Sequence, residues 1–87
     1  MSPTHTVDEE LAEQVRDTLA STLKVPAEAI APHAGQADVE GWDSLGQLNL
    51  VMELEGRFKI SFTTEQVLRM RSIPEIVAVI KEHLHGR

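Results

Sequence analysis

Apolar residues recur at helical spacing in several stretches of the chain, the first of them near the amino terminus. Its apolar residues share one face of a helix, while the charged residues between them fall away from that face. The apolar face consists of Leu11, Val15, Leu19 and Leu23, with Ala12 beside them. Thr6 and Glu9 stand at capping-box spacing, which places the start of this helix near Val7. We expect it to end before Pro26.

The stretch from Ser44 to Phe58 is too apolar for a helix with a single buried face. Because successive residues of a helix are about 100° apart, its apolar side chains divide between two faces. The face that we expect to be buried consists of Leu50, Val51, Leu54 and Phe58. The other face, which we expect to be exposed, consists of Leu45, Leu48 and Met52. Asp43 or Ser44 would cap this helix, and Ser44 and Gln47 have capping-box spacing.

Two further helices are predicted in the last third of the chain. Thr63 and Gln66 have capping-box spacing, which predicts a short helix over residues 64–70. Val67 and Met70 would face inward from it.

The last helix is predicted by a clear apolar stripe. The stripe consists of Ile73, Ile76, Val77, Ile80 and Leu84. Ser72 and Glu75 repeat the capping spacing, and Pro74 is tolerated in a first helical turn. We expect this helix to end near Leu84.

Residues 24–43 have no sustained period, and a long loop is predicted here by Pro26, Pro32, Gly35 and Gly41. Ile30 is expected to pin this loop to the core. Neither strand alternation nor an internal repeat is found. We therefore predict an all-α fold, a small four-helix bundle of three long helices and one short helix, with the long loop between the first two. A single domain is expected over residues 1–87, with an ordered core over about 7–84.

Composition and charge restrict the chemistry of this bundle. Aromatic residues make up only 3% of the chain, so the core must be aliphatic, and the absence of cysteine excludes disulfides, thiolate metal sites and a catalytic thiol of its own. The formal net charge of -6 repels nucleic acids and anionic lipid surfaces, so we expect neither as a partner. With no apolar run of membrane-spanning length and no secretory signal, the expected compartment is the cytoplasm.

The candidate functional residue is Ser44, which stands where the long loop meets the second helix. Free amides and the helix dipole favour negative charge at a helix start, so a phosphoester on the Ser44 hydroxyl would be stabilised there. The alternative is that Ser44 only caps the helix. A serine hydrolase is a poor interpretation, because no histidine stands nearby in the sequence as a base and the chain is too short to build a cleft.

The segment 38–60 resembles the acyl carrier protein family around its phosphopantetheine attachment serine. In that family an Asp-Ser-Leu motif opens the second helix after a long loop, and a Phe closes it. The matching residues here are Asp43, Ser44, Leu45 and Phe58. The resemblance implies that a phosphopantetheinyl transferase moves a 4'-phosphopantetheine arm from coenzyme A to Ser44, which Asp43 helps to present. The thiol of the arm would hold acyl groups as thioesters, in agreement with the lack of cysteine.

The resemblance also implies a carrier rather than an enzyme. Besides the transferase, its partners would be the enzymes that load and accept the acyl groups. The expected partner surface consists of Leu45, Leu48, Met52, Glu53 and Glu55. In this surface Met packs adaptably against different partners, and the carboxylates steer basic partner faces. We expect the protein to be a monomer.

Differences from the carriers of fatty acid synthesis favour another pathway. Those carriers usually have acidic residues at positions where this chain has Gly46, Asn49, Gly56 and Arg57. The stretch 42–51 is more similar to discrete carriers of polyketide, peptide or other specialised pathways. We favour such a pathway, with general fatty acid synthesis and peptidyl (aminoacyl) carriage as alternatives. From a different class, an unmodified helical interaction module would use the same exposed apolar face only for docking.

The remaining conspicuous side chains have structural interpretations. Trp42 is expected to pack at the corner between the loop and the second helix. His83 and His85 diverge on a helix, and together with His5 and His33 they are expected to be solvated rather than to bind a metal.

Overall fold

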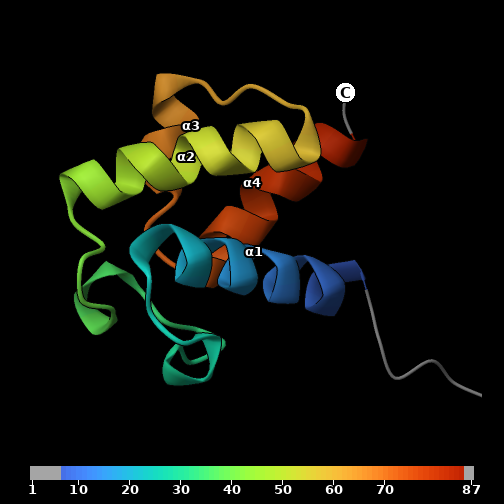
Figure 1. Cartoon of the computed structure of the whole chain (residues 1–87). Helices are drawn as coiled ribbons and strands as arrows, with labels where there is room; N and C mark the ends of the chain where they lie inside the picture. Colours follow the sequence, from blue (N-terminus) through green and yellow to red (C-terminus); the bar gives the residue numbers. More distant parts are fainter. Residues whose placement is uncertain (1–6, 86–87) are drawn as a thin grey trace, which may run out of the picture.

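The computed structural model describes residues 7–85 of the chain, and within them the fold is all-α. The helices are α1 (Val7–Leu23), α2 (Ser44–Phe58), α3 (Thr64–Arg69) and α4 (Ile73–His85) (Figure 1). The prediction of three long helices and one short helix is confirmed: α2 has the expected bounds, α3 and α4 end within one residue of the expected position, and α1 ends before Pro26 as expected. Thr6, half of the capping box proposed for α1, lies outside the described residues.

The long connection between α1 and α2 is less irregular than expected. It contains two short 3-10 helices, η1 (Ala27–Ala29) and η2 (Gln36–Asp38). Ile30 is 2% exposed, as predicted. The connection also pairs with the turn between α3 and α4, where Gln36 N–H donates to the Arg71 carbonyl and Ile73 N–H donates to the Ala34 carbonyl, both at 3.0 Å. These backbone bonds fix the loop that leads into α2.

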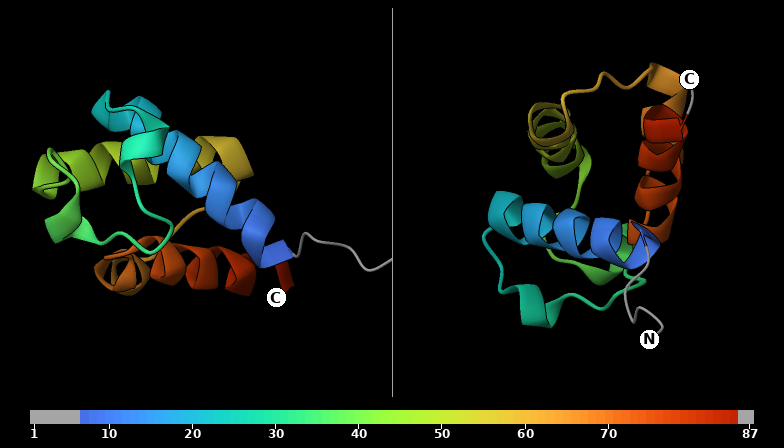
Figure 2. Two further views of the ribbon diagram at one scale, coloured as in Figure 1. Left: turned by 90° about the horizontal axis from the view of Figure 1, so that it is seen from below. Right: turned by 90° about the vertical axis from the view of Figure 1, so that its right-hand side faces the viewer.

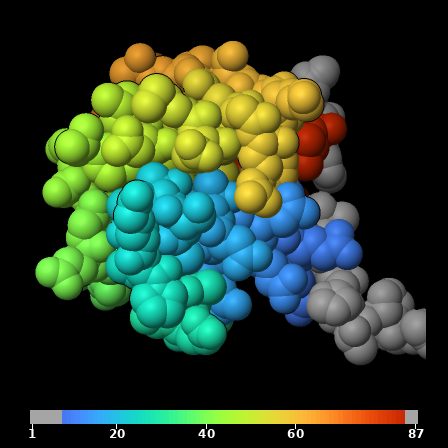
Figure 3. Space-filling view, viewed as in Figure 1, coloured from blue at the N-terminus to red at the C-terminus, as the bar shows by residue number. Residues whose placement is uncertain are grey.

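The core lies where α1 packs against both α2 and α4, as the two views of Figure 2 show. It is mainly aliphatic, as the composition predicts, with Trp42 as its buried aromatic residue, and its fully buried side chains include Leu19, Leu50, Leu54, Ile76 and Ile80. In the space-filling view the side chains of α1 and α2 meet along a continuous surface (Figure 3). No helix within residues 7–85 is both long and apolar enough to span a bilayer.

The buried face predicted for α2 is confirmed except at its last residue. Leu50, Val51 and Leu54 are buried, but Phe58 is only half-buried and packs on the edge of the core. The reason is its position at the end of the helix, because Lys59 follows in the left-handed conformation at φ 58° and turns the chain away. The expectation that Phe58 is buried with the rest of this face is therefore wrong.

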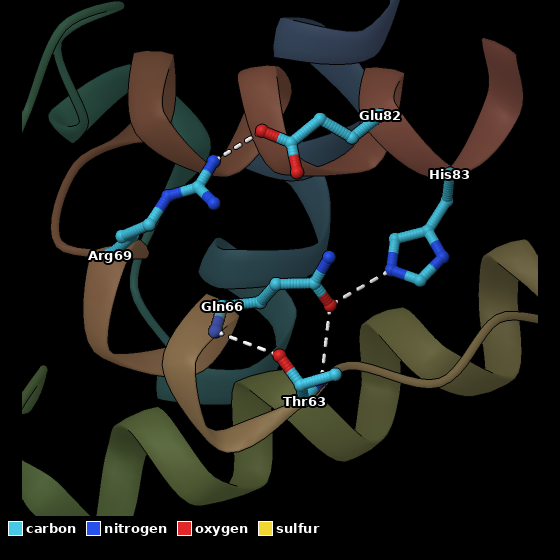
Figure 4. A network of polar contacts seen from close by, with 5 residues as sticks. All are labelled: Thr63, Gln66, Arg69, Glu82 and His83. Carbon is cyan, nitrogen blue, oxygen red and sulfur yellow. Dashed lines mark hydrogen bonds and ion pairs between the residues drawn. The ribbon is translucent and has the colours of Figure 1, made fainter. Parts of the chain in front are cut away.

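Polar contacts tie α3 to α4, as Figure 4 shows. The predicted capping box is present: Gln66 N–H donates to the Thr63 hydroxyl at 3.1 Å, and Thr63 N–H donates to the Gln66 side-chain oxygen at 3.0 Å. The same Gln66 oxygen lies 3.0 Å from His83 Nε2. Arg69 and Glu82 form an ion pair, whose hydrogen bond lowers the pKa of Glu82. These contacts hold the short α3 in place beside α4.

Of the histidines expected to be solvated, one is exposed and another is half-buried. His33 is exposed, as expected, whereas His83 is half-buried and also packs edge-on against the Phe62 ring at 5.4 Å. The expectation of a solvated His83 is therefore wrong, because its ring joins α3 to α4. His5 and the side chain of His85 lie outside what the structure describes. Within residues 8–84 no group of three or more potential metal-ligating side chains is found.

Candidate attachment site at the start of the second helix

Ser44 is the first residue of α2 and is exposed. Of the two predicted caps, the structure uses Asp43: its carboxylate accepts from Gly46 N–H at 2.9 Å, and its carbonyl accepts from Gln47 N–H at 2.8 Å. The Ser44 hydroxyl makes no hydrogen bond to any described residue. The proposed capping box between Ser44 and Gln47 is therefore wrong, and the serine is left free for another role.

Gln47 instead joins the loop, α2 and α3 through its side chain. The amide oxygen accepts from the indole Nε1–H of Trp42 at 2.7 Å. The amide nitrogen donates to the carbonyl of Met70 at 2.9 Å and, more weakly, to that of Val67 at 3.4 Å. Trp42 is 3% exposed, so its predicted packing role is confirmed. This network is anchored three residues after the exposed Ser44 in the same helix.

The sequence contained a signal for this network that the pattern analysis missed. Gln47 lies three and four residues before Leu50 and Val51, which places it on the buried face of α2. A polar residue on a buried helix face needs a hydrogen-bonding partner, and so does a buried indole N–H. Trp42 and Gln47 meet this need with one hydrogen bond, from the indole N–H to the Gln47 amide oxygen.

Two glycines allow the loop to approach the first turn of α2. Gly41 has φ +87°, a conformation that favours glycine. A β-carbon on Gly46 would lie 2.2 Å from the Gly41 carbonyl oxygen and 3.0 Å from Leu23 Cδ2. The close backbone approach therefore leaves no room for a side chain at position 46.

A hollow of about 440 Å³ opens beside Ser44. It is lined by residues of the loop, α2, α3 and the turn after α3, namely Gln36, Asp43, Ser44, Gln47, Val67, Leu68 and Arg71. Arg71 brings a positive charge to this hollow, which is otherwise flanked by the Asp43 carboxylate. Leu68, which the sequence analysis did not single out, is 63% exposed.

The residues present fit a phosphodiester on Ser44. Its hydroxyl is exposed, and the amides of Ser44 and Leu45 have no acceptor among the described residues. Free amides at a helix start favour a negative charge, and so does the cationic Arg71 of the adjoining hollow. A phosphopantetheine arm would be held by the Ser44 oxygen and these groups, and its thiol would supply the thioester chemistry that this cysteine-free chain lacks.

The expected partner surface is arranged along α2. Leu45, Leu48 and Met52 are 66%, 56% and 55% exposed, so the second apolar face of this helix does point outward. Glu53 is exposed as well. Glu55 differs, because it is half-buried and its carboxylate accepts from Phe62 N–H at 2.9 Å. That bond ties down the segment between α2 and α3.

Comparisons with known proteins agree with this geometry. A family model described as the phosphopantetheine attachment site matches residues 13–80. An acyl carrier protein of Streptomyces coelicolor is 37% identical over 79 residues, which cover 88% of this chain and 86% of that protein. Acyl carrier proteins of Syntrophus aciditrophicus and Clostridium acetobutylicum are 30% and 34% identical over 71 residues, covering 82% of this chain and 89% and 92% of theirs.

Proposed function

This chain belongs to the acyl carrier protein family, a family of carriers rather than enzymes, and we propose that Ser44 is the residue that bears its 4'-phosphopantetheine arm. The observation that carries the proposal is the free hydroxyl of Ser44, exposed at a helix start that Asp43 already caps. In the transfer, the Ser44 oxygen forms a bond to the β-phosphorus of coenzyme A. The bond from that phosphorus to adenosine 3',5'-bisphosphate breaks, and the hydroxyl proton leaves to a base of the transferase.

Intact mass measures this transfer directly. The apo-protein is incubated with coenzyme A and a broad-specificity phosphopantetheinyl transferase, and wild type is compared with Ser44→Ala. Ser61→Ala, at another exposed serine, serves as the matched control. We expect wild type and Ser61→Ala to gain one phosphopantetheine and Ser44→Ala to gain none. An unmodified wild type would contradict the proposal and favour an unmodified interaction module, whereas a modified Ser44→Ala would place the attachment at another residue.

For the pathway, we propose specialised biosynthesis, such as that of a polyketide, rather than general fatty acid synthesis. The support is the charge of α2, whose carboxylates are Glu53 and Glu55, of which Glu55 is engaged with Phe62. A fatty-acid synthesis enzyme that docks on a strongly acidic helix would find Glu53 as the one exposed carboxylate of α2. Peptidyl carriage is the other candidate. The mass of the group found on Ser44 in protein from the native host distinguishes these cargoes.

A further inference from the structure

We infer that Gln47 is a specificity-determining residue: it closes the gap between α2 and α3 behind Ser44, so that cargo stays in the surface hollow and does not enter the core. The inference rests on the proposed attachment at Ser44 and adds a class of cargo to it. The cargo that this arrangement favours is a short or polar acyl group. A long alkyl chain would find no buried site behind the serine.

The position of Gln47 allows its side chain to close the gap between α2 and the end of α3. It stands three residues after Ser44, is 9% exposed, and lines the same hollow. From α2 its amide reaches across to the carbonyls of Met70 and Val67 at the end of α3. On its other side the amide holds the indole of Trp42. One side chain therefore spans the gap through which a chain attached at Ser44 would have to pass.

The groups that the Gln47 amide holds belong to buried residues. Met70 and Leu50 are 0% exposed and Trp42 is 3% exposed. To admit an alkyl chain, the Gln47 amide would have to swing away from Trp42 and Met70. The indole N–H and the Met70 carbonyl would then lose their partners in apolar surroundings. Methylene groups bring no donor or acceptor to replace them, so entry of an alkyl chain is opposed.

The hollow in front of Gln47 has the opposite character. Gln36, Asp43 and Arg71 line it along with the apolar Val67 and Leu68. Hydroxyl, keto or amino groups of a cargo have hydrogen-bonding partners among these polar side chains. Val67 and Leu68 offer an apolar wall for only a short alkyl segment. The lining thus favours a short or polar acyl group over a long alkyl chain.

The test compares two cargoes on the same carrier. Ser44 is loaded from acetyl-coenzyme A or octanoyl-coenzyme A by the transferase, and loading is verified by intact mass. The thermal midpoint and the backbone amide NMR shifts of Leu50, Val67 and Met70 are then measured for both forms. In wild type we expect equal midpoints and equal shifts, because neither chain is buried.

Variants that remove the closure should behave differently. Gln47→Met keeps the side-chain volume but not the bridging hydrogen bonds, and Trp42→Phe/Gln47→Leu also removes the indole N–H that would be left unpaired. In these variants the octanoyl form should melt several degrees above the acetyl form, since buried methylenes stabilise the folded state. The amide shifts of Val67 and Met70 should change as well.

The following results would overturn the proposed role of Gln47. A wild-type octanoyl form that melts higher and shifts core amides would overturn the inference, even if every variant failed to fold. Folded Gln47 variants that do not distinguish octanoyl from acetyl would overturn it too. If Ser44 gains no mass, the proposed attachment fails and the inference falls with it. A normally loaded carrier that buries its octanoyl chain contradicts only the role of Gln47.

Discussion

The carbonyl oxygen of Gly41 lies 2.2 Å from the position that a β-carbon on Gly46 would occupy. No real pair of atoms of this kind comes so close, so the loop and the first turn of α2 can meet only because residue 46 has no side chain. Gly56, in the same helix, has no atom beyond its chain neighbours and the nearby helix backbone within 4 Å of its ideal β-carbon position. The fold therefore requires glycine at position 46, whereas position 56 has room for a side chain.

Alanine at these two glycines should change stability in opposite directions. Gly46→Ala forces the loop away from α2, and we expect a loss of about 1–3 kcal/mol, typical of overpacking. Gly56→Ala should instead stabilise the protein by about 0.5–1 kcal/mol, because alanine has the higher helix propensity. Urea unfolding curves measure both. Equal effects of the two substitutions would mean that the loop does not contact α2 as the structure shows.

The comparison of Gly46 with the other residues of α2 shows what the sequence could predict. The two apolar faces of this helix follow from helical periodicity, so the burial of Leu50 and Leu54 and the exposure of Leu48 were predictable. The need for glycine at 46 was not, because it depends on how Gly41 turns the loop back onto the helix. Such a contact is tertiary and leaves no periodic signal.

The same distinction applies to the candidate site. Ser44 was recognisable from its motif at a helix start. Asp43, which caps α2 in the structure, was one of the two residues predicted to cap that helix. The bond from Gln47 to the Met70 carbonyl joins residues 23 positions apart, so local capping spacing gave the wrong partner for this glutamine. A buried glutamine has several possible partners, and only the position of the carboxyl end of α3 beside α2 decides among them.

The difference between buried and edge positions on α2 can be measured with two substitutions. Leu54 is 0% exposed, so Leu54→Ala should cost about 2–5 kcal/mol. Phe58 packs on the edge of the core and is half-buried, so Phe58→Ala should cost roughly half of the 3–5 kcal/mol typical of a buried aromatic residue. Thermal and urea unfolding test this order. A Phe58→Ala variant much less stable than Leu54→Ala would place the centre of the core near the end of α2.

Glu53 and Glu55, the two carboxylates of α2 predicted to steer partners, should have different roles. Glu55→Ala removes the acceptor of Phe62 N–H, and we expect a stability loss of about 1–2 kcal/mol. Glu53→Ala removes an exposed carboxylate and should change stability by less than about 0.5 kcal/mol.

Kinetics provide the second half of this comparison. Glu53→Ala should slow association with a partner that has a basic face, most clearly at low salt, because exposed charges act mainly on the association rate. Stopped-flow measurements at two salt concentrations test this. If Glu53→Ala lowers stability while Glu55→Ala changes only association, the assignment of the two glutamates is reversed.

The apolar stripe of α2 leads to the last prediction. Leu48 and Met52 lie four and eight residues after Ser44, on roughly the same side of the helix, and more than half of each side chain is exposed. The double variant Leu48→Gln/Met52→Gln should keep its thermal midpoint within a few degrees of wild type, as surface substitutions usually do. It should nevertheless sharply slow the gain of mass at Ser44 in the transferase reaction, because the enzyme loses the apolar surface beside its target serine. Leu84→Gln is the matched control, since Leu84 is 50% exposed on α4 and should leave both midpoint and rate unchanged. A large fall in the midpoint with an unchanged rate for the remaining folded protein would show that the stripe contributes to the core rather than to docking.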